Sequence, residues 1–185
     1  MKLKEVIKCA CTIIGLDDLL SSIESETISQ DQQKMIDMLV DYFNKVQEEI
    51  ATEFMPVLAS ENLKRANTLD FSDLDKQILD VIYLKDKNKR KVSYELFVDH
   101  LKFDGEIEEI VYSFIPDEVG FNDDILFLVP KRVYAYAMAR EYYLFEGLLD
   151  KATDFEQRFK NSVKQIMSKD KARFTASYMP KRLWL

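Results

Sequence analysis

The sequence predicts an α+β fold, a helical bundle built from N- and C-terminal helices with a β-rich subdomain inserted between them. Near both ends of the chain, apolar residues recur at three- and four-residue steps, which is the period of an amphipathic helix. Between residues 63 and 130 this pattern gives way to runs of β-branched and aromatic residues, separated by charged or glycine-containing turns. The 185 residues suffice for one compact domain with an insertion. We therefore expect the bundle at 1–62 and 130–170, the insertion at 63–129 and an extended C-terminal tail at 171–185.

Local signals place the N-terminal helices. The first helix should end at Gly15, because glycine adopts the left-handed conformation that stops a helix. A short helix and a loop are expected between Asp17 and Ser29, and the next helix opens with the capping-box spacing of Ser29 and Gln32. Pro56 should end that long helix. The apolar stripes comprise Leu3, Val6, Ile7, Ala10, Ile13 and Ile14 in the first helix and Met35, Leu39, Tyr42, Phe43, Val46, Ile50 and Phe54 in the long one.

The inserted region predicts a hairpin and a further strand. Two apolar runs flank the charged turn 85–91, which is typical of a hairpin with a solvated tip. Asp104-Gly105 predicts a second turn. Residues 110–115 predict a strand with one strongly apolar face, which should stop at Pro116. The two hairpin strands are expected at 80–84 and 92–98, and an acid-rich loop at 117–124.

Two further helices are predicted in the C-terminal part. Pro130 is suited to the first turn of a helix that ends near Gly147. The helix after Gly147 should pair with it in antiparallel orientation, because the connection is short. Beyond Asp170 the chain loses helical spacing and becomes basic and aromatic, which indicates a tail. The two apolar faces comprise Val133, Tyr134, Ala137, Met138, Tyr142 and Phe145, followed by Leu148, Ala152, Phe155, Phe159, Val163 and Ile166.

Composition excludes several classes of protein. The 33 acidic and 26 basic residues give a formal charge of −7, so the chain has no overall positive field for gripping a nucleic acid. Cys9 and Cys11 should point to different sides of one helix, which favours reduced thiols. His100 is the only histidine, so we expect neither a zinc site nor another cofactor. The sequence contains no run of about 18 uncharged apolar residues and no secretory signal, which indicates a protein made in the cytoplasm and not inserted in a membrane.

The residues that carry reactive chemistry do not form a catalytic pattern. His100 follows Asp99, but there is no nucleophile elbow, so we interpret it as a surface or structural histidine. The range 104–124 holds eight acidic residues and no lysine or arginine. Its spacing fits neither a calcium loop nor a pair of catalytic carboxylates, and we interpret it as a solvated acidic loop. The sequence therefore favours a protein that is not an enzyme.

Two segments are candidates for interaction. The predicted hairpin tip holds Lys85, Lys87, Lys89, Arg90 and Lys91, which would contact phosphates or simply keep an exposed turn solvated, and we favour the solvated turn. The tail combines large apolar side chains with basic ones, a poor composition for exposure to water. Because aromatic residues and arginine often dominate interface energies, we favour docking of the tail on a partner over folding back on its own chain. The docking residues are Arg173, Phe174, Tyr178, Lys181, Arg182 and Trp184.

Several segments, taken in order, resemble the head–tail adaptor or neck-ring proteins of tailed bacteriophages. The segment 44–57 (NKVQEEIATEFMPV) is similar to a recurrent motif with E-I-A followed by an aromatic residue and P-L. The strands at 78–81 (ILDV) and 111–116 (VYSFIP) resemble the strands of that family, the second standing before an acid-rich loop. The stretch 132–159 (RVYAYAMAREYYLFEGLLDKATDFEQRF) resembles its C-terminal helices, and 179–184 (MPKRLW) resembles a basic-aromatic ending.

The resemblance implies a virion structural protein located in the neck. It implies a dodecameric ring beneath the portal protein that extends the DNA channel and connects to other neck or tail proteins. DNA would pass through without sequence-specific binding, which agrees with an acidic chain. The tail would bind the portal or a neighbouring subunit, and the basic hairpin would face the lumen or the tail.

The sequence features leave two other functions open. A tail-completion or terminator protein would have a similar size and would also form a ring. A cytosolic helical regulator that binds one host partner would instead form a discrete one-to-one complex.

Overall fold

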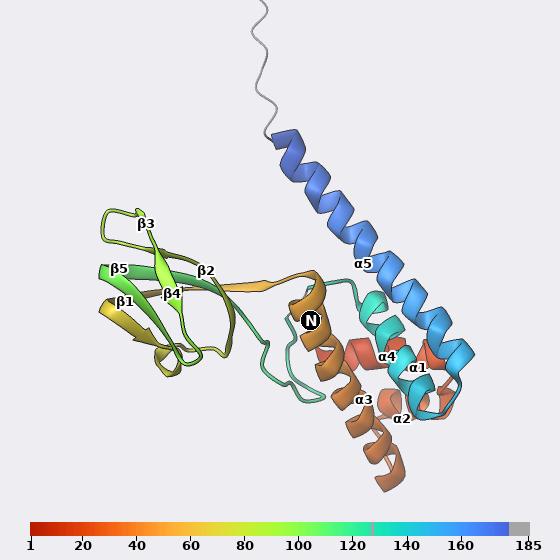
Figure 1. Ribbon diagram of the computed structural model, residues 1–185. Coiled ribbons are helices and arrows are strands. Elements are labelled where there is room, and N and C mark those ends of the chain that lie inside the picture. Colours follow the sequence, from red (N-terminus) through yellow and green to blue (C-terminus); the bar gives the residue numbers. More distant parts are fainter. Residues whose placement is uncertain (127, 178–185) are drawn as a thin grey trace, which may run out of the picture. The chain divides into compact units, whose positions relative to one another are not determined.

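The computed structural model describes residues 1–126 and 128–177, with side chains up to residue 168. The fold is α+β, as the sequence predicts (Figure 1). The chain divides into a helical unit, Met1–Gln47 with Glu118–Leu185, and a sheet unit, Glu48–Asp117. The sheet unit is therefore inserted in sequence between the two parts of the helical unit.

The helical unit contains the predicted helices. They are α1 (Leu3–Ile14), α2 (Asp17–Ser25), α3 (Gln30–Glu49), α4 (Lys131–Phe145) and α5 (Leu149–Ser177). Gly15 follows α1 with a φ of 89°, the left-handed stop expected there. The capping box before α3 is also confirmed, because the Ser29 N–H donates to Gln32 Oε1 at 2.9 Å while the Gln32 N–H donates to Ser29 Oγ at 3.3 Å.

The core of the helical unit joins α1, α3, α4 and α5. The rings of Phe43 on α3 and Tyr134 on α4 lie 4.9 Å apart. The Tyr143 hydroxyl donates to the Ile14 carbonyl at 3.1 Å and so connects the ends of α4 and α1. The antiparallel pairing of α4 with α5 is visible in Figure 1 and places Phe155 against both Tyr136 and Tyr143. The fully buried side chains include Leu3, Val6, Ile7, Ile36, Leu39, Phe43, Val46, Tyr134, Met138, Phe159 and Val163.

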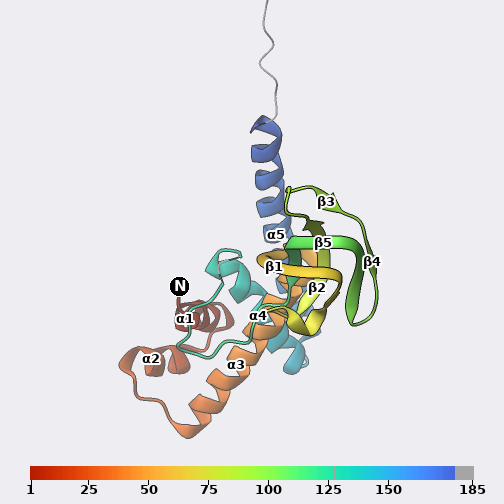
Figure 2. The same cartoon turned by 90° about the vertical axis from the view of Figure 1, so that its left-hand side faces the viewer.

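A π-helical turn at Ile50–Phe54 continues directly from α3, and the helical conformation ends before Pro56 as expected. The strands that follow are β1 (Val57–Asp70), β2 (Ile78–Lys85), β3 (Lys91–Val92), β4 (Tyr94–Leu96) and β5 (His100–Phe114), with a 3₁₀ turn at Phe71–Asp73. They form one antiparallel sheet of five strands in the order β1-β5-β2-β3, with β4 also paired to β5 (Figure 2). The first strand thus begins upstream of residue 63.

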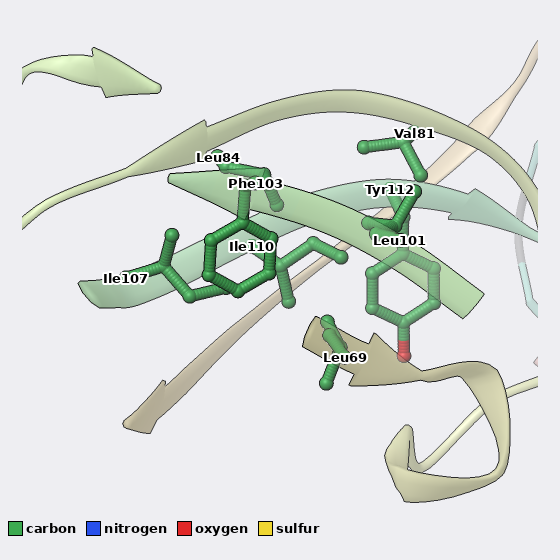
Figure 3. Close-up of a cluster of buried hydrophobic side chains, with 8 residues drawn as sticks. All are labelled: Leu69, Val81, Leu84, Leu101, Phe103, Ile107, Ile110 and Tyr112. Carbon is green, nitrogen blue, oxygen red and sulfur yellow. The ribbon is translucent and has the colours of Figure 1, made fainter. Parts of the chain in front are cut away.

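The long strand β5 organises the core of the sheet unit. Figure 3 shows apolar side chains from β1, β2 and β5 gathered on one face of the sheet. The Tyr112 ring is fully buried, and its hydroxyl donates to the Glu61 carboxylate. Burial and this hydrogen bond raise the pKa of Tyr112, so the phenol stays protonated and keeps its donor role. The cluster comprises Leu69, Val81, Leu84, Leu101, Phe103, Ile107, Ile110 and Tyr112.

The predicted turn at Asp104-Gly105 is wrong. Both residues lie within β5, where Gly105 has a φ of 89° and its N–H donates to Asn67 Oδ1 at 3.4 Å. Asn67 on β1 also has a positive φ, of 65°, and the strand register shifts between Ala66 and Thr68. A glycine that adopts a positive φ therefore makes an irregularity inside a continuous strand pair, because backbone pairing resumes on both sides.

The prediction that helical structure ends near Asp170 is also wrong, because α5 continues to Ser177. Residues 171–177 contain alanine, lysine and arginine and no glycine or proline, so the intrinsic propensity favours continuing the helix. The apolar spacing that marks a buried helix face is a signal of packing, and its loss does not by itself end a helix.

Candidate functional site

The predicted hairpin tip is a hydrogen-bonded turn built on Asp86. The N–H groups of Arg90 and Asn88 both donate to Asp86 Oδ1 at 2.8 Å, and the Lys89 N–H donates to the Asp86 carbonyl at 2.9 Å. These backbone donors, with that of Arg90 foremost, hold the pKa of the Asp86 carboxyl below its usual range. The basic side chains of the turn are therefore presented on a fixed backbone.

The charges of the turn are partly neutralised by the sheet below it. Lys85 Nζ lies 2.8 Å from Glu109 Oε2, and Ser60 Oγ donates to Glu109 Oε1 at 3.0 Å. The hydrogen bond from Lys85 holds the pKa of Glu109 below its usual range. Lys85 and Lys91 also lie over the Tyr83 ring, at 4.6 and 5.3 Å from its centroid. Lys87, Lys89 and Arg90 are exposed, which agrees with the interpretation of a solvated tip.

The predicted docking residues of the tail fall in two places. Arg173 and Phe174 belong to the backbone of α5. Tyr178, Lys181, Arg182 and Trp184 lie outside the described residues. The first seven residues of the predicted tail, 171–177, therefore belong to α5.

The residues with reactive side chains show ordinary structural contacts. His100 Nδ1 lies 2.7 Å from Asp99 Oδ1, and the imidazole stacks on Phe97 with ring centroids 4.6 Å apart. Burial raises the pKa of the Cys11 thiol to about 11 and also raises that of Cys9, so neither favours the thiolate that a nucleophile requires.

Among residues 1–126 and 128–177, no three or more His, Cys, Asp and Glu side chains gather closely enough to hold a metal ion. Within the same part of the chain, no helix combines the length and the apolar character needed to cross a bilayer.

The tight turn between α4 and α5 carries an apolar surface that the sequence reasoning missed. Gly147 has a φ of 72°, its N–H donates to the Leu144 carbonyl at 3.1 Å, and the Leu148 N–H donates to the Tyr143 carbonyl at 2.8 Å. This pair of hydrogen bonds is the Schellman arrangement that closes a helix on a left-handed residue. The reversal leaves the residues on both sides of Gly147 at the tip of the helical pair.

We call the apolar side chains at this tip the apical patch, defined as Leu144, Phe145, Leu148 and Leu149. Phe145 is 71% exposed and Leu149 is 64% exposed, while the other two are nearly half exposed. Phe145 and Leu148, which the sequence places on the apolar faces of the two helices, are therefore not part of the buried core. Their helical spacing agrees with the core stripe, but at the last turn of α4 and just before α5 no helix among the described residues covers them. The sequence does contain a signal for this surface. Four large apolar residues flank the turn, and a single buried helix face does not need all of them.

Most of the charged side chains next to the apical patch are acidic. Glu146, Asp150 and Asp154 are exposed at or near the turn. Lys151 is also exposed, and its ammonium group lies over the Tyr143 ring at 5.0 Å from the ring centroid. The patch is thus a surface of large apolar side chains with carboxylates beside it.

A second exposed apolar set occurs in the sheet unit, at the last residue of β4 and in the connection to β5. We call Leu96, Phe97 and Val98 the loop patch; Val98 is fully exposed. One face of Phe97 is occupied by His100. Large exposed apolar side chains are common singly, but sets of neighbouring ones often mark interaction sites.

Comparison with protein-family models finds no match, and comparison with curated proteins finds none.

Proposed function

We propose that the chain is a virion structural protein, a head–tail adaptor that forms a ring beneath the portal of a tailed bacteriophage. In this role it extends the DNA channel and connects the portal to other neck or tail proteins. It is made in the host cytoplasm and resides in the virion neck. The observation that carries the proposal is the exposed apolar patch at the N-terminal end of α5, in a chain whose sequence continues after Ser177 with a basic, aromatic segment.

Such a placement suits a subunit that binds its neighbours. In a ring, one face of each subunit contacts a different face of the next one, so each subunit needs two dissimilar surfaces. The apical patch supplies one surface of this kind, and the segment after Ser177 supplies sequence of the complementary chemistry.

The charge of the chain supports a channel that does not grip DNA. A channel through which DNA slides must avoid a dense array of phosphate contacts, and a protein with a formal charge of −7 repels phosphates on average. Four of the basic side chains at the hairpin tip, Lys87, Lys89, Arg90 and Lys91, are exposed, while the charge of Lys85 is paired with Glu109. We assign that tip to the lumen or to the side that faces the tail.

The choice of the adaptor family in this proposal rests on the resemblance of sequence segments. The stretch 132–159 that resembles adaptor helices forms most of α4 and the first part of α5, and 44–57 spans the end of α3 through the start of β1. This order of segments favours a neck protein over a regulator that binds one host partner.

The proposal predicts that the C-terminal segment is needed for assembly with the portal and not for folding. A chain that ends at Ser177 should keep the far-ultraviolet circular dichroism expected from its helices but lose co-purification with the portal protein of the same virus. Val98→Ser is the matched control, because it also removes an exposed apolar side chain and should leave portal binding intact. Unchanged co-purification of the shortened chain would contradict the proposal.

A further inference from the structure

We infer that residues 178–185 of one copy dock on the apical patch of a second copy. The inference deepens the proposed function, since the ring rests on that proposal, but the contact itself is argued from the geometry and chemistry of this chain. The receiving surface is Leu144, Phe145, Leu148 and Leu149.

The length of α5 excludes docking of the segment on the patch of its own chain. The helix has 29 residues, and at about 1.5 Å per residue its axis from Leu149 to Ser177 is about 42 Å long. Figures 1 and 2 show it as one straight rod that leaves the turn between α4 and α5. Eight residues follow Ser177, and fully extended they reach at most about 29 Å. A segment on the apical patch therefore comes from another molecule.

The two surfaces match in chemistry. The segment 178–185 (YMPKRLWL) contains five large apolar residues and two basic ones, Lys181 and Arg182. The patch presents apolar side chains with Glu146, Asp150 and Asp154 exposed beside it. Burial of the apolar groups stabilises the contact, while opposite charges at the rim steer and orient it. Tryptophan, tyrosine and arginine, all present in the segment, are the residues that most often dominate interface energies.

The proposed contact is directional, and its direction determines which kind of assembly the copies form. The donor segment follows the C-terminal end of α5 in sequence, whereas the acceptor patch lies at the N-terminal end of α5. The two also differ in composition, so the interface is heterologous. Each copy can give its segment to one neighbour and receive a segment from another. Repetition generates a ring if the rotation closes, and an open filament otherwise.

Sedimentation of the full-length chain and its variants tests this contact. The acceptor variant is Phe145→Ser with Leu149→Ser, both at strongly exposed positions where a polar residue does not disturb the core. The donor variant is Leu183→Ser with Trp184→Ser. We expect the wild-type chain to self-associate with rising concentration and each variant alone to associate at least about tenfold more weakly. Val98→Ser, which alters the loop patch, should associate like the wild type.

The decisive arm is a mixture of the two variants. One intact segment and one intact patch remain between them, so an equimolar mixture should form a one-to-one dimer and nothing larger. The inference is overturned if the wild-type chain stays monomeric up to its solubility limit, if the acceptor variant associates as strongly as the wild type, or if the mixture forms no dimer. Loss of association in Val98→Ser instead would place the docking site on the loop patch and would also overturn it.

The outcomes separate this contact from the proposed function. If self-association follows the expected pattern but the wild-type chain does not bind the portal, the adaptor role fails and the contact between copies stands. If the acceptor variant still binds the portal but the donor variant does not, and no self-association occurs, the segment serves the portal and the inference fails.

Discussion

Arg140 holds two carboxylates where α4 meets α5. Its Nη1 lies 2.6 Å from Glu156 Oε2, its Nη2 lies 2.7 Å from Glu141 Oε1, and Lys160 Nζ lies 2.6 Å from Glu156 Oε1. Partial burial alone raises the pKa of Glu156, but the hydrogen bonds from Lys160 and Arg140 outweigh it and the pKa lies below its usual range. The network therefore stabilises the helical pair only while Glu156 is ionised.

We predict that Glu156→Gln lowers the free energy of unfolding by about 1 kcal/mol at neutral pH. A carboxyl whose pKa is lower in the folded state stabilises the fold above the unfolded-state value, and this contribution is lost as the pH falls through the folded-state value. The difference between wild type and variant should therefore shrink as the pH drops below about 4.5. Urea unfolding followed by circular dichroism across this range measures it.

Asp154→Asn on the same helix is the matched control, because its side chain is exposed and has no described ion pair. It should change the free energy of unfolding by less than about 0.5 kcal/mol at every pH. A gap between Glu156→Gln and the wild type that stays constant down to strongly acidic pH would show that the network does not depend on the ionised carboxylate.

At the residue scale, the sequence predicts positions whose structure depends on near neighbours. Gly15 and the Ser29–Gln32 pair act through hydrogen bonds within a few residues, so a local pattern suffices. Phe145 and Leu148 are different, because their burial depends on which helix covers them. Helical spacing predicts which residues share a face of the helix, but it does not predict where the helix that packs on this face ends.

The Gly147 turn determines the geometry of α4, α5 and the apical patch together. An added side chain would meet open space there, so only the backbone conformation, with a φ of 72°, disfavours other residues. The Schellman hydrogen bonds from Gly147 and Leu148 require this conformation. The sequence predicts this end of α4 correctly, because the signal is again local.

We predict that Gly147→Ala destabilises the protein by about 1–2 kcal/mol, the cost of a left-handed conformation for a residue with a side chain. Gly147→Asn is the matched comparison, because asparagine tolerates this conformation, and it should cost clearly less. Urea unfolding gives both values. Equal effects of the two substitutions, or none from alanine, would show that the turn does not depend on its left-handed residue.

Strand content is predicted less accurately than helix content, for a physical reason. The turn 85–91 is predicted correctly because its signal lies within the turn. Gly105 carries the same kind of signal, yet β5 continues through it because the pairing partner, β1, follows the irregularity with a positive φ at Asn67. Whether a glycine makes a turn or a bulge depends on a partner strand distant in sequence.

At the scale of the whole molecule, the sequence predicts some of the interaction surfaces, and only the structure reveals the others. The basic hairpin and the C-terminal segment are recognisable from composition, but the apical patch emerges only when α4 and α5 are folded against each other. The reach of the segment likewise depends on α5 continuing to Ser177, which the apolar spacing does not reveal. The assembly proposed here therefore needs both the sequence of the segment and the length of the helix that carries it.

The central claim is that this chain joins copies of itself to a portal, and an image of assembled particles tests it most directly. Electron microscopy of virions with the chain labelled at its N-terminus should show a ring of the labelled protein between the portal and the tail. Labels at the far end of the tail would favour a tail-terminator role. Complete particles that contain none of the chain would contradict the account.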